Sequence, residues 1–381
     1  MPISTGALLV VLSILIFLGL IEAILHRNAI SRIPIRIHVN GTRGKSSVVR
    51  LIAAGLREGG LKTFAKTTGT IPRIINEKGK DLELHRLRTA TIGEQIKLIR
   101  FFGKKSPDAL VMECMAVNPQ YQWISEHKIV KSTLGVITNV RRDHVDEMGN
   151  TIKDIAFSLS NTIPFNSKVF TSEKLSLKYL KNVADQRNSE LNDSSEYSVD
   201  SDYMDKMPYL EHKENVNLAL AVCEQIGIKR KKALVGMLKT NPDPGALLIW
   251  NLDNNNKFIS AFAANDPDST FKVWELIKSK EKNKICFFLN SRDDRRYRTN
   301  QLIDLVLNRI NPDLFIIRAD NVEAEIAKYV NKTKIKNFTM KSNQNDVINY
   351  ILELNQYTVV GIGNIVGWGE DFINKLKKFK I

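Results

Sequence analysis

Residues 38–47 read His-Val-Asn-Gly-Thr-Arg-Gly-Lys-Ser-Ser, and this stretch decides the fold. Residues 35–39, Ile-Arg-Ile-His-Val, predict a strand that leads into the turn, and residues 45–57 predict a helix that follows it. A glycine turn between a strand and a helix gathers backbone N–H groups at the positive end of the helix dipole. The stretch therefore predicts a phosphate-binding loop.

Each residue type in this loop suits a nucleotide with its metal ion. Lys45 can reach the outer phosphates as a candidate catalytic residue, and the hydroxyl of Ser46 can bind Mg²⁺. The full Walker pattern has glycine where this chain has Val39, but the strand and helix context supports the assignment. The candidate ATP-binding residues of the loop are Asn40, Gly41, Thr42, Arg43, Gly44, Lys45, Ser46 and Ser47.

Strands and helices alternate after the loop, which predicts a mostly parallel sheet covered by helices on both faces. Residues 188–205 are polar and predict a surface hairpin or loop. The expected strands are 62–67, 108–114, 132–140 and 168–172, and the expected helices are 92–104, 119–127, 151–162, 175–188, 214–226 and 230–239.

The segment Asn241-Pro242-Asp243-Pro244-Gly245 predicts a linker between two domains. Residues 33–240 form the expected nucleotide-binding domain, and residues 245–381 a smaller Rossmann-like domain. In the second domain we expect strands at 247–251, 257–262, 284–289, 313–317, 335–339 and 357–361, with helices at 270–280, 300–310, 322–331, 344–354 and 370–379.

Residues 1–26 predict a transmembrane anchor. No residue from Met1 to Ile21 is charged, and the apolar run is long enough to cross a bilayer. The positive charges at Arg27 and Arg32 follow the run, which places the body of the protein in the cytoplasm. The alternative is a buried core helix, and a cleaved signal peptide is disfavoured because the start carries no positive charge.

The composition is that of a folded globular chain, with 43% hydrophobic and 25% charged residues. The net charge of +15 comes from basic residues spread along the chain, so we expect anionic lipid or anionic small molecules as partners and no nucleic acid. The three cysteines are widely spaced and predict neither a zinc site nor a disulfide framework.

Two further candidate metal ligands follow strands. Glu113 ends the strand at 108–114, at the edge of the sheet where ligands bind in folds of this kind. His144 follows the strand at 132–140 and stands between Asp143 and Asp146. We expect Glu113 and His144 to be catalytic and metal-binding, although Glu113 alone could instead cap a helix.

The order Asn-Gly-Thr-x-Gly-Lys-Ser resembles the phosphate loop of Mur ligases and folylpolyglutamate synthetases. Residues 38–75 are similar to the ligase subunits of poly-γ-glutamate synthases almost throughout. The segment 138–146 is similar to the T-N-x-x-x-D-H-x-D signature of these ligases. The resemblance implies that Glu113 and His144 hold Mg²⁺.

Downstream, the resemblance weakens but implies further nucleotide contacts. Residues 212–217 are similar to the segment that contacts adenine, which makes Asn215 and Asn217 candidates. Arg292 and Asp293 lie where the family has a G-x-R-D loop. Residues 265–269 match another family position but lack its tyrosine and histidine.

The implied activity is ATP-dependent amide ligation through an acyl phosphate, with glutamate or polyglutamate as substrate and γ-linked poly-γ-glutamate as product. The resemblance also implies integral-membrane synthase or export subunits as partners. Three alternatives stay open: a folylpolyglutamate-synthetase-like ligase, a P-loop phosphotransferase or nucleotidase, and a membrane scaffold that only binds nucleotide.

Overall fold

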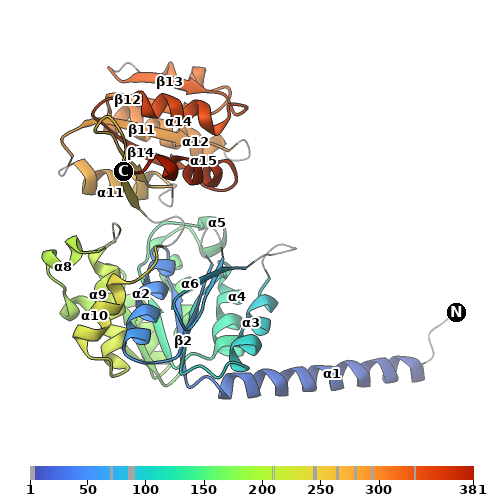
Figure 1. Cartoon of the computed structure of the whole chain (residues 1–381). Coiled ribbons are helices and arrows are strands. Elements are labelled where there is room, and N and C mark those ends of the chain that lie inside the picture. Colours follow the sequence, from blue (N-terminus) through green and yellow to red (C-terminus); the bar gives the residue numbers. More distant parts are fainter. Residues whose placement is uncertain are drawn as a thin grey trace. The chain divides into compact units, whose positions relative to one another are not determined.

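The computed structural model describes residues 5–68, 72–84, 91–207, 209, 211–242, 247–262, 266–278, 281–292, 296–329 and 332–381. The chain divides into two compact units (Figure 1). Unit 1 comprises Met1–Pro208 and His212–Asn241, and unit 2 comprises Tyr209–Glu211 and Pro242–Ile381.

Unit 1 contains an eight-stranded sheet in the order β4-β3-β2-β5-β1-β6-β7-β8. The six strands from β2 to β8 in this order are parallel, which confirms the mostly parallel sheet, whereas β3 and β4 are antiparallel. The strands are β1(Ile35–Asn40), β2(Thr63–Thr67), β3(Arg73–Ile75), β4(Asp81–Glu83), β5(Ala109–Glu113), β6(Leu134–Ile137), β7(Lys168–Thr171) and β8(Glu190–Asp193).

Of the surface hairpin or loop expected within residues 188–205, the hairpin was wrong, and the loop is confined to residues 198–200 between short elements. This segment contains the parallel edge strand β8, a 3-10 turn η3(Ser194–Tyr197) and a short helix α8(Ser201–Asp205). The side chains of Asp193 and Asp200 cap the two helical turns by accepting hydrogen bonds from backbone N–H groups. Polar residues here terminate and start elements, which a composition-based prediction cannot distinguish from a loop.

Helices cover both faces of the sheet. They are α2(Lys45–Glu58), α3(Gly93–Gly103), α4(Pro119–Ile124), η1(Ser125–Val130), α5(Val145–Met148), α6(Ile152–Leu159), η2(Ser160–Thr162), α7(Leu177–Gln186), α9(Lys213–Gln225) and α10(Arg230–Leu238). The π-helix η1 widens the end of α4 and closes at Lys131 in the left-handed conformation. Helix α2, which starts at the phosphate loop, packs on α9 and α10.

The N-terminal helix α1(Thr5–Ser31) extends beyond the predicted anchor. Among the described residues it is the one helix that is long and apolar enough to cross a membrane. Its last turn is part of the core of unit 1, because Ala29 and Ile30 are buried with Phe102 of α3. A Cβ atom on Gly103 would lie 2.8 Å from the backbone oxygen of Ala29, so α1 and α3 meet backbone to backbone there.

Unit 2 contains a six-stranded sheet in the order β13-β12-β11-β14-β10-β9, in which only β9 is antiparallel. Its strands are β9(Leu248–Asn251), β10(Lys257–Ser260), β11(Lys284–Asn290), β12(Leu314–Arg318), β13(Lys334–Phe338) and β14(Tyr357–Gly363). Its helices are α11(Pro267–Lys278), α12(Arg296–Asp304), η5(Leu305–Ile310), α13(Glu323–Ile326), α14(Gln344–Leu352), α15(Trp368–Leu376) and η6(Lys377–Phe379).

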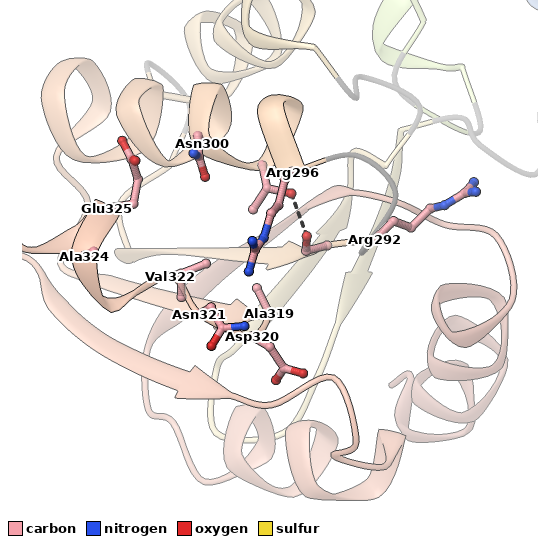
Figure 2. A pocket seen from close by; sticks show the side chains of 11 residues that line it. Arg292, Arg296, Asn300, Ala319, Asp320, Asn321, Val322, Ala324 and Glu325 are labelled. Carbon is pink, nitrogen blue, oxygen red and sulfur yellow. Dashed lines mark hydrogen bonds between the residues drawn. The ribbon is translucent and has the colours of Figure 1, made fainter.

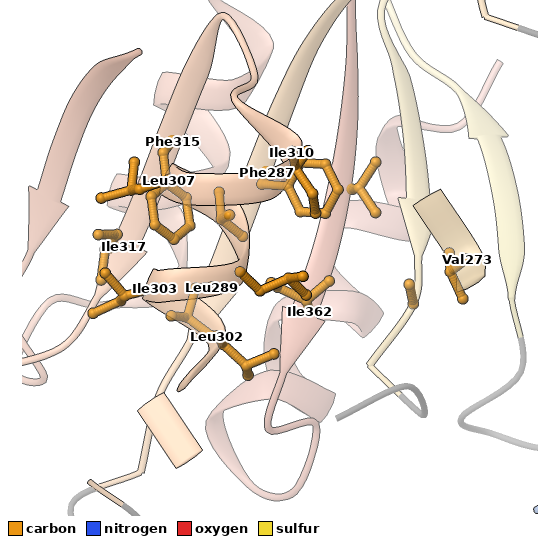
Figure 3. Packing of buried hydrophobic residues seen from close by; sticks show 14 of the residues in the cluster. Val273, Phe287, Leu289, Leu302, Ile303, Leu307, Ile310, Phe315, Ile317 and Ile362 are labelled. Atoms are coloured by element: carbon orange, nitrogen blue, oxygen red, sulfur yellow. The ribbon is translucent and has the colours of Figure 1, made fainter. Parts of the chain in front are cut away.

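Each face of this second sheet has its own buried cluster, which confirms the prediction of a smaller Rossmann-like domain. Figure 3 shows the cluster in which Phe287, Leu289 and Ile362 of the sheet meet Leu302, Ile303 and Leu307 of α12 and η5. The other face buries Phe258, Phe288 and Phe372. The helix predicted at 322–331 is much shorter, because α13 ends at Ile326.

Candidate functional site

The phosphate loop connects β1 to α2, as predicted, and two glycines shape it. Gly41 and Gly44 have φ angles of 131° and 79°, which disfavour other residues. A Cβ atom on Gly41 would lie 2.1 Å from Thr138 Oγ1, and one on Gly44 would lie 2.7 Å from Asn215 Oδ1. Conformation therefore favours glycine at both positions, and at Gly41 the nearby backbone of Thr138 also leaves no space for a side chain.

The end of β6 holds the loop from one side. The backbone carbonyl of Asn139 accepts from Thr42 N at 3.0 Å, and its side-chain oxygen accepts from Arg43 N at 3.1 Å. The Thr42 hydroxyl bonds to both backbone groups of Arg141. The N–H groups of the first turn of α2, at Lys45, Ser46 and Ser47, have no carbonyl partner within the helix, so an anion is best placed there.

The Lys45 ammonium group lies across the loop. Its Nζ donates to the carbonyl oxygens of Gly41 at 2.7 Å and Thr42 at 3.2 Å. A cation fixed beside the first turn of α2 adds to the helix dipole and favours a polyphosphate at this point.

Glu113 and Ser46 meet at the edge of the sheet. Glu113 Oε2 accepts hydrogen bonds from Ser46 Oγ at 2.8 Å and from Thr68 N at 2.7 Å, and the side chain is buried. The register of the parallel pair β1–β5 causes this, because Val39 and Glu113 are partners and the loop follows immediately. A hydroxyl and a carboxylate beside a phosphate site are the hard oxygen ligands that Mg²⁺ prefers.

No group of three or more His, Cys, Asp or Glu side chains suited to a metal occurs in the described part of the chain. A divalent ion at Glu113 and Ser46 would therefore take its remaining ligands from phosphate oxygens and water. This is the usual arrangement for Mg²⁺ bound together with a nucleotide.

His144 lines the same cavity of about 170 Å³ as Lys45 and Glu113. Its backbone is left-handed, with φ 45°, and its side chain is 56% exposed. Asp143 accepts from the backbone N–H of His144 at 3.0 Å and forms an ion pair with Arg43 at 3.3 Å. Asp143 thus ties the His144 turn to the phosphate loop.

Glu173 is a buried carboxylate at this edge that was not predicted from the sequence. It accepts from Val140 N at 2.7 Å and from Arg141 Nη1 at 2.8 Å, and it also accepts from Ser176 N. Glu173 follows the end of β7, so its position after a parallel strand could have identified it. Through Arg141 it fixes the segment that holds Thr42.

A buried ion pair lies behind the loop on β1. His38 Nδ1 is 2.8 Å from Glu126 Oε2, and Glu126 Oε1 accepts from both the backbone and the hydroxyl of Ser132. Burial alone would lower the pKa of His38, because it disfavours the imidazolium. The neighbouring Cys114 and Glu126 have the larger combined effect and raise the pKa of His38 to about 10.

The two candidate adenine contacts, Asn215 and Asn217, lie in different places. Asn215 lies against Gly44 of the loop, whereas the Asn217 side chain accepts from Val199 N at 3.1 Å. Residues two apart on a helix point about 200° apart, so both cannot face one ligand from α9. The Asn40 side chain lies beneath the loop, where it donates to Gln122 Oε1 at 2.8 Å.

Unit 2 contains a second polar pocket, of about 150 Å³, at the carboxyl ends of β11 and β12. Figure 2 shows Arg296 pointing across it toward Ala319 and Asn321, whereas Arg292 points away from them. Asp293, the other candidate in this loop, lies outside the described residues. The polar side chains that line the pocket are Ser291, Arg292, Arg296, Thr299, Asn300, Asp320, Asn321 and Glu325.

Comparison with known proteins gives two family matches that cover most of the chain. Residues 39–241 match the Mur ligase middle domain, and residues 249–379 match the poly-γ-glutamate synthase CapB C-terminal domain. The capsule biosynthesis protein CapB of Bacillus anthracis is 34% identical over 96% of this chain and 82% of its own length. The PGA synthase CapB of Bacillus subtilis (strain 168) is 32% identical over 98% of both chains.

Solved structures show the same fold. The E. coli FolC complex with ADP superposes with a TM-score of 0.74 at 14% identity and covers 94% of both chains. The Yersinia pestis bifunctional folylpolyglutamate synthase/dihydrofolate synthase, complexed with AMPPNP and Mn ion, has a TM-score of 0.72 at 14% identity and covers 93% of this chain and 92% of its own. The chain is an ATP-dependent amide ligase of the Mur type, and it belongs to the poly-γ-glutamate synthase CapB family.

Proposed function

We propose that the protein extends poly-γ-glutamate by activating a terminal γ-carboxylate with ATP and joining it to the amine of a free glutamate. The observation that carries the proposal is the contact between Ser46 and Glu113 beside Lys45, at the first turn of α2. This arrangement suits ATP with Mg²⁺, and relatives of the same family are named PGA synthase and capsule biosynthesis protein.

The role of unit 1 in the reaction is to hold the triphosphate. Lys45 and the N–H groups of Lys45, Ser46 and Ser47 would bind phosphate oxygens, Glu113 and Ser46 would hold Mg²⁺, and His144 would serve a second ion. A bound divalent ion would neutralise charge on the transferred phosphoryl group. Asn215, beside Gly44, is placed to contact the nucleotide.

The proposed ligation consists of two successive substitution reactions. A carboxylate oxygen attacks the γ-phosphorus, ADP leaves, and an acyl phosphate forms. The glutamate amine then attacks the acyl carbon, phosphate leaves with one oxygen of the original carboxylate, and the amine loses a proton. Each turnover releases one ADP and one phosphate for one amide bond.

The pocket of unit 2 suits an amino-acid substrate. The guanidinium group of Arg296, which points across the pocket, suits a carboxylate, and Asp320 and Glu325 suit an ammonium group. Glutamate presents all of these charges in one small molecule. We propose that this pocket binds the incoming glutamate.

We further propose that α1 is a single-pass membrane anchor, with the catalytic body in the cytoplasm. Residues 6–25, of which Glu22 alone is charged, are exposed around the whole helix, which a soluble domain does not favour. Integral-membrane synthase or export subunits are the partners that this location suggests.

An oxygen-isotope experiment tests the ligase chemistry. The full-length protein in detergent is incubated with ATP, Mg²⁺ and a short γ-glutamyl acceptor whose terminal γ-carboxylate carries ¹⁸O. We expect phosphate release that depends on added glutamate, one ¹⁸O atom transferred to phosphate, and a product one residue longer by mass spectrometry.

The outcomes separate the alternative functions. ADP formation without glutamate dependence and without amide product would indicate a phosphotransferase or nucleotidase and overturn the proposal. A product one residue longer without ¹⁸O in the released phosphate would contradict activation of the γ-carboxylate but retain amide ligation. Activity only with a folate acceptor would favour the folylpolyglutamate-synthetase-like alternative.

A further inference from the structure

The base of α1 is held rigidly between two elements of unit 1. On one side, Arg100 of α3 forms an ion pair with Glu22 at 3.1 Å and donates to its backbone oxygen at 2.7 Å. On the other side, His26 Nε2 contacts the carbonyl oxygen of Ile129 in η1 at 2.9 Å. Unit 1 therefore begins within about one turn of the point where the apolar part of α1 ends.

Helix α3 presents an amphipathic stripe to solvent beside this junction. Lys97, Phe101 and Lys104 are exposed and follow the i, i+4, i+7 spacing of one helix face. Phe101 is 44% exposed, and Lys105 Nζ lies 5.8 Å from the centre of its ring. An exposed aromatic ring between lysines suits the boundary between lipid headgroups and acyl chains.

The opposite flank of α1 repeats this pattern. Lys128 of η1 and Lys131, which caps η1, are both exposed. Lys128 Nζ lies 5.3 Å from the ring centre of the half-buried Trp123. In Figure 1, α1 leaves unit 1 on the side that carries α3 and α4. Both aromatic–lysine pairs therefore belong to the elements that surround the exit of α1.

The acidic residues of these elements do not counter this charge at the surface. Glu94 of α3 forms an ion pair with the buried Lys66, and Glu126 of η1 is buried against His38. Glu22 is already neutralised by Arg100. The exposed charge around the base of α1 is therefore positive, which complements an anionic surface.

We propose that this surface, formed by α3 and η1 around the base of α1, rests on the headgroups of an anionic phospholipid bilayer. The inference depends on the proposed membrane anchor and goes beyond it. An anchor alone would leave unit 1 in the aqueous phase, whereas this surface holds one defined face of the ATP-binding unit on the membrane.

Site-directed spin labelling of the full-length protein in nanodiscs tests the proposal. Phe101→Cys places a nitroxide on the surface, Leu15→Cys reports insertion of α1, and Lys181→Cys on α7 is the exposed control. Cys114, Cys223 and Cys286 are buried, and burial raises the pKa of the Cys223 and Cys286 thiols, so the unsubstituted protein is the labelling blank.

In discs of phosphatidylcholine with phosphatidylglycerol, the label at position 101 should be several-fold less accessible to a water-soluble nickel chelate than the label at position 181. The protection should weaken in phosphatidylcholine alone, at high salt, and when Lys97→Gln and Lys104→Gln are added. Equal accessibility at positions 101 and 181, with position 15 protected, overturns the surface proposal alone. Accessibility at position 15 overturns the anchor and this inference together.

Discussion

Replacing Glu113 by glutamine removes one negative charge and almost no volume from the site. Glu113 Oε2 accepts two hydrogen bonds, from Ser46 and Thr68, and an amide oxygen can accept both. Each bond should weaken from about 2 to about 1 kcal/mol, so the free energy of unfolding should fall by at most about 2 kcal/mol. The cheaper burial of a neutral amide offsets part of this loss.

The loss of turnover should be larger than the loss of stability. A carboxylate that holds a divalent ion at a transferring phosphoryl group contributes several kcal/mol to transition-state stabilisation. A loss of about 3 kcal/mol corresponds to a decrease in kcat of more than about a hundredfold, since 1.36 kcal/mol is a factor of ten. Nucleotide affinity should change far less, because Lys45 and the first turn of α2 still bind the phosphates.

The assay measures phosphate release against Mg²⁺ concentration, together with the Kd of a fluorescent ATP analogue and the thermal midpoint. Glu147→Gln is the matched control, because Glu147 is a surface carboxylate of α5 that bonds to Asn118 at 3.1 Å. A Glu113→Gln protein that keeps turnover within about a factor of ten at every Mg²⁺ concentration would refute the assignment of Glu113 as a metal ligand.

Four other changes test neighbouring parts of the structure. Lys45→Ala should abolish ATP turnover and alter stability by less than about 1 kcal/mol, as measured by phosphate release and thermal unfolding, because Lys45 contacts the loop and not the core. Removal of residues 1–26 should give a soluble protein that still hydrolyses ATP, because Ala29 and Ile30 remain; aggregation without nucleotide binding would contradict this. Glu173→Gln, with Glu190→Gln as the exposed control, should raise the Mg²⁺ concentration needed for half-maximal turnover more than it lowers the thermal midpoint, because it loosens Arg141. Glu126→Gln should destabilise the protein by about 3 kcal/mol at low pH. Since the pKa of His38 is raised from 6.5 to about 10, the ion pair contributes fully below pH 6.5, and the difference in thermal midpoint from the unsubstituted protein should shrink as pH rises through about 10.

The parts of the fold that follow from local pattern were predicted well from the sequence. The strand–turn–helix of the phosphate loop depends on residues close together in the chain. Glycines at these positions between a strand and a helix are specific for such a loop. The position of Glu113 beside Ser46 was predicted because every parallel strand brings its carboxyl end to the same edge, and its role as a metal ligand stays a prediction. The short strands β3 and β4 were missed because three residues carry too little periodicity to show a pattern.

Other features depend on contacts that a single sequence does not encode locally. Glu173 acts through Val140 and Arg141, more than thirty residues away along the chain, which the register of β6 and β7 brings together. The rotation of α9 about its axis brings Asn215, and not Asn217, to the phosphate loop. The likeness to the ligase family gave both residues, and only the helix geometry separates them.

The backbone contact between Gly103 and Ala29 would have a mechanical consequence in the membrane-anchored state proposed for α1. The exposed apolar part of the helix spans about 30 Å, and a thinner bilayer makes such a helix tilt. Because α1 is continuous from this part into the packed turn, a tilt of the helix would be transmitted to unit 1. Bilayer thickness would then load the contact that α3 and η1 are proposed to make with the headgroups, so lipid composition would act on the ligase mechanically.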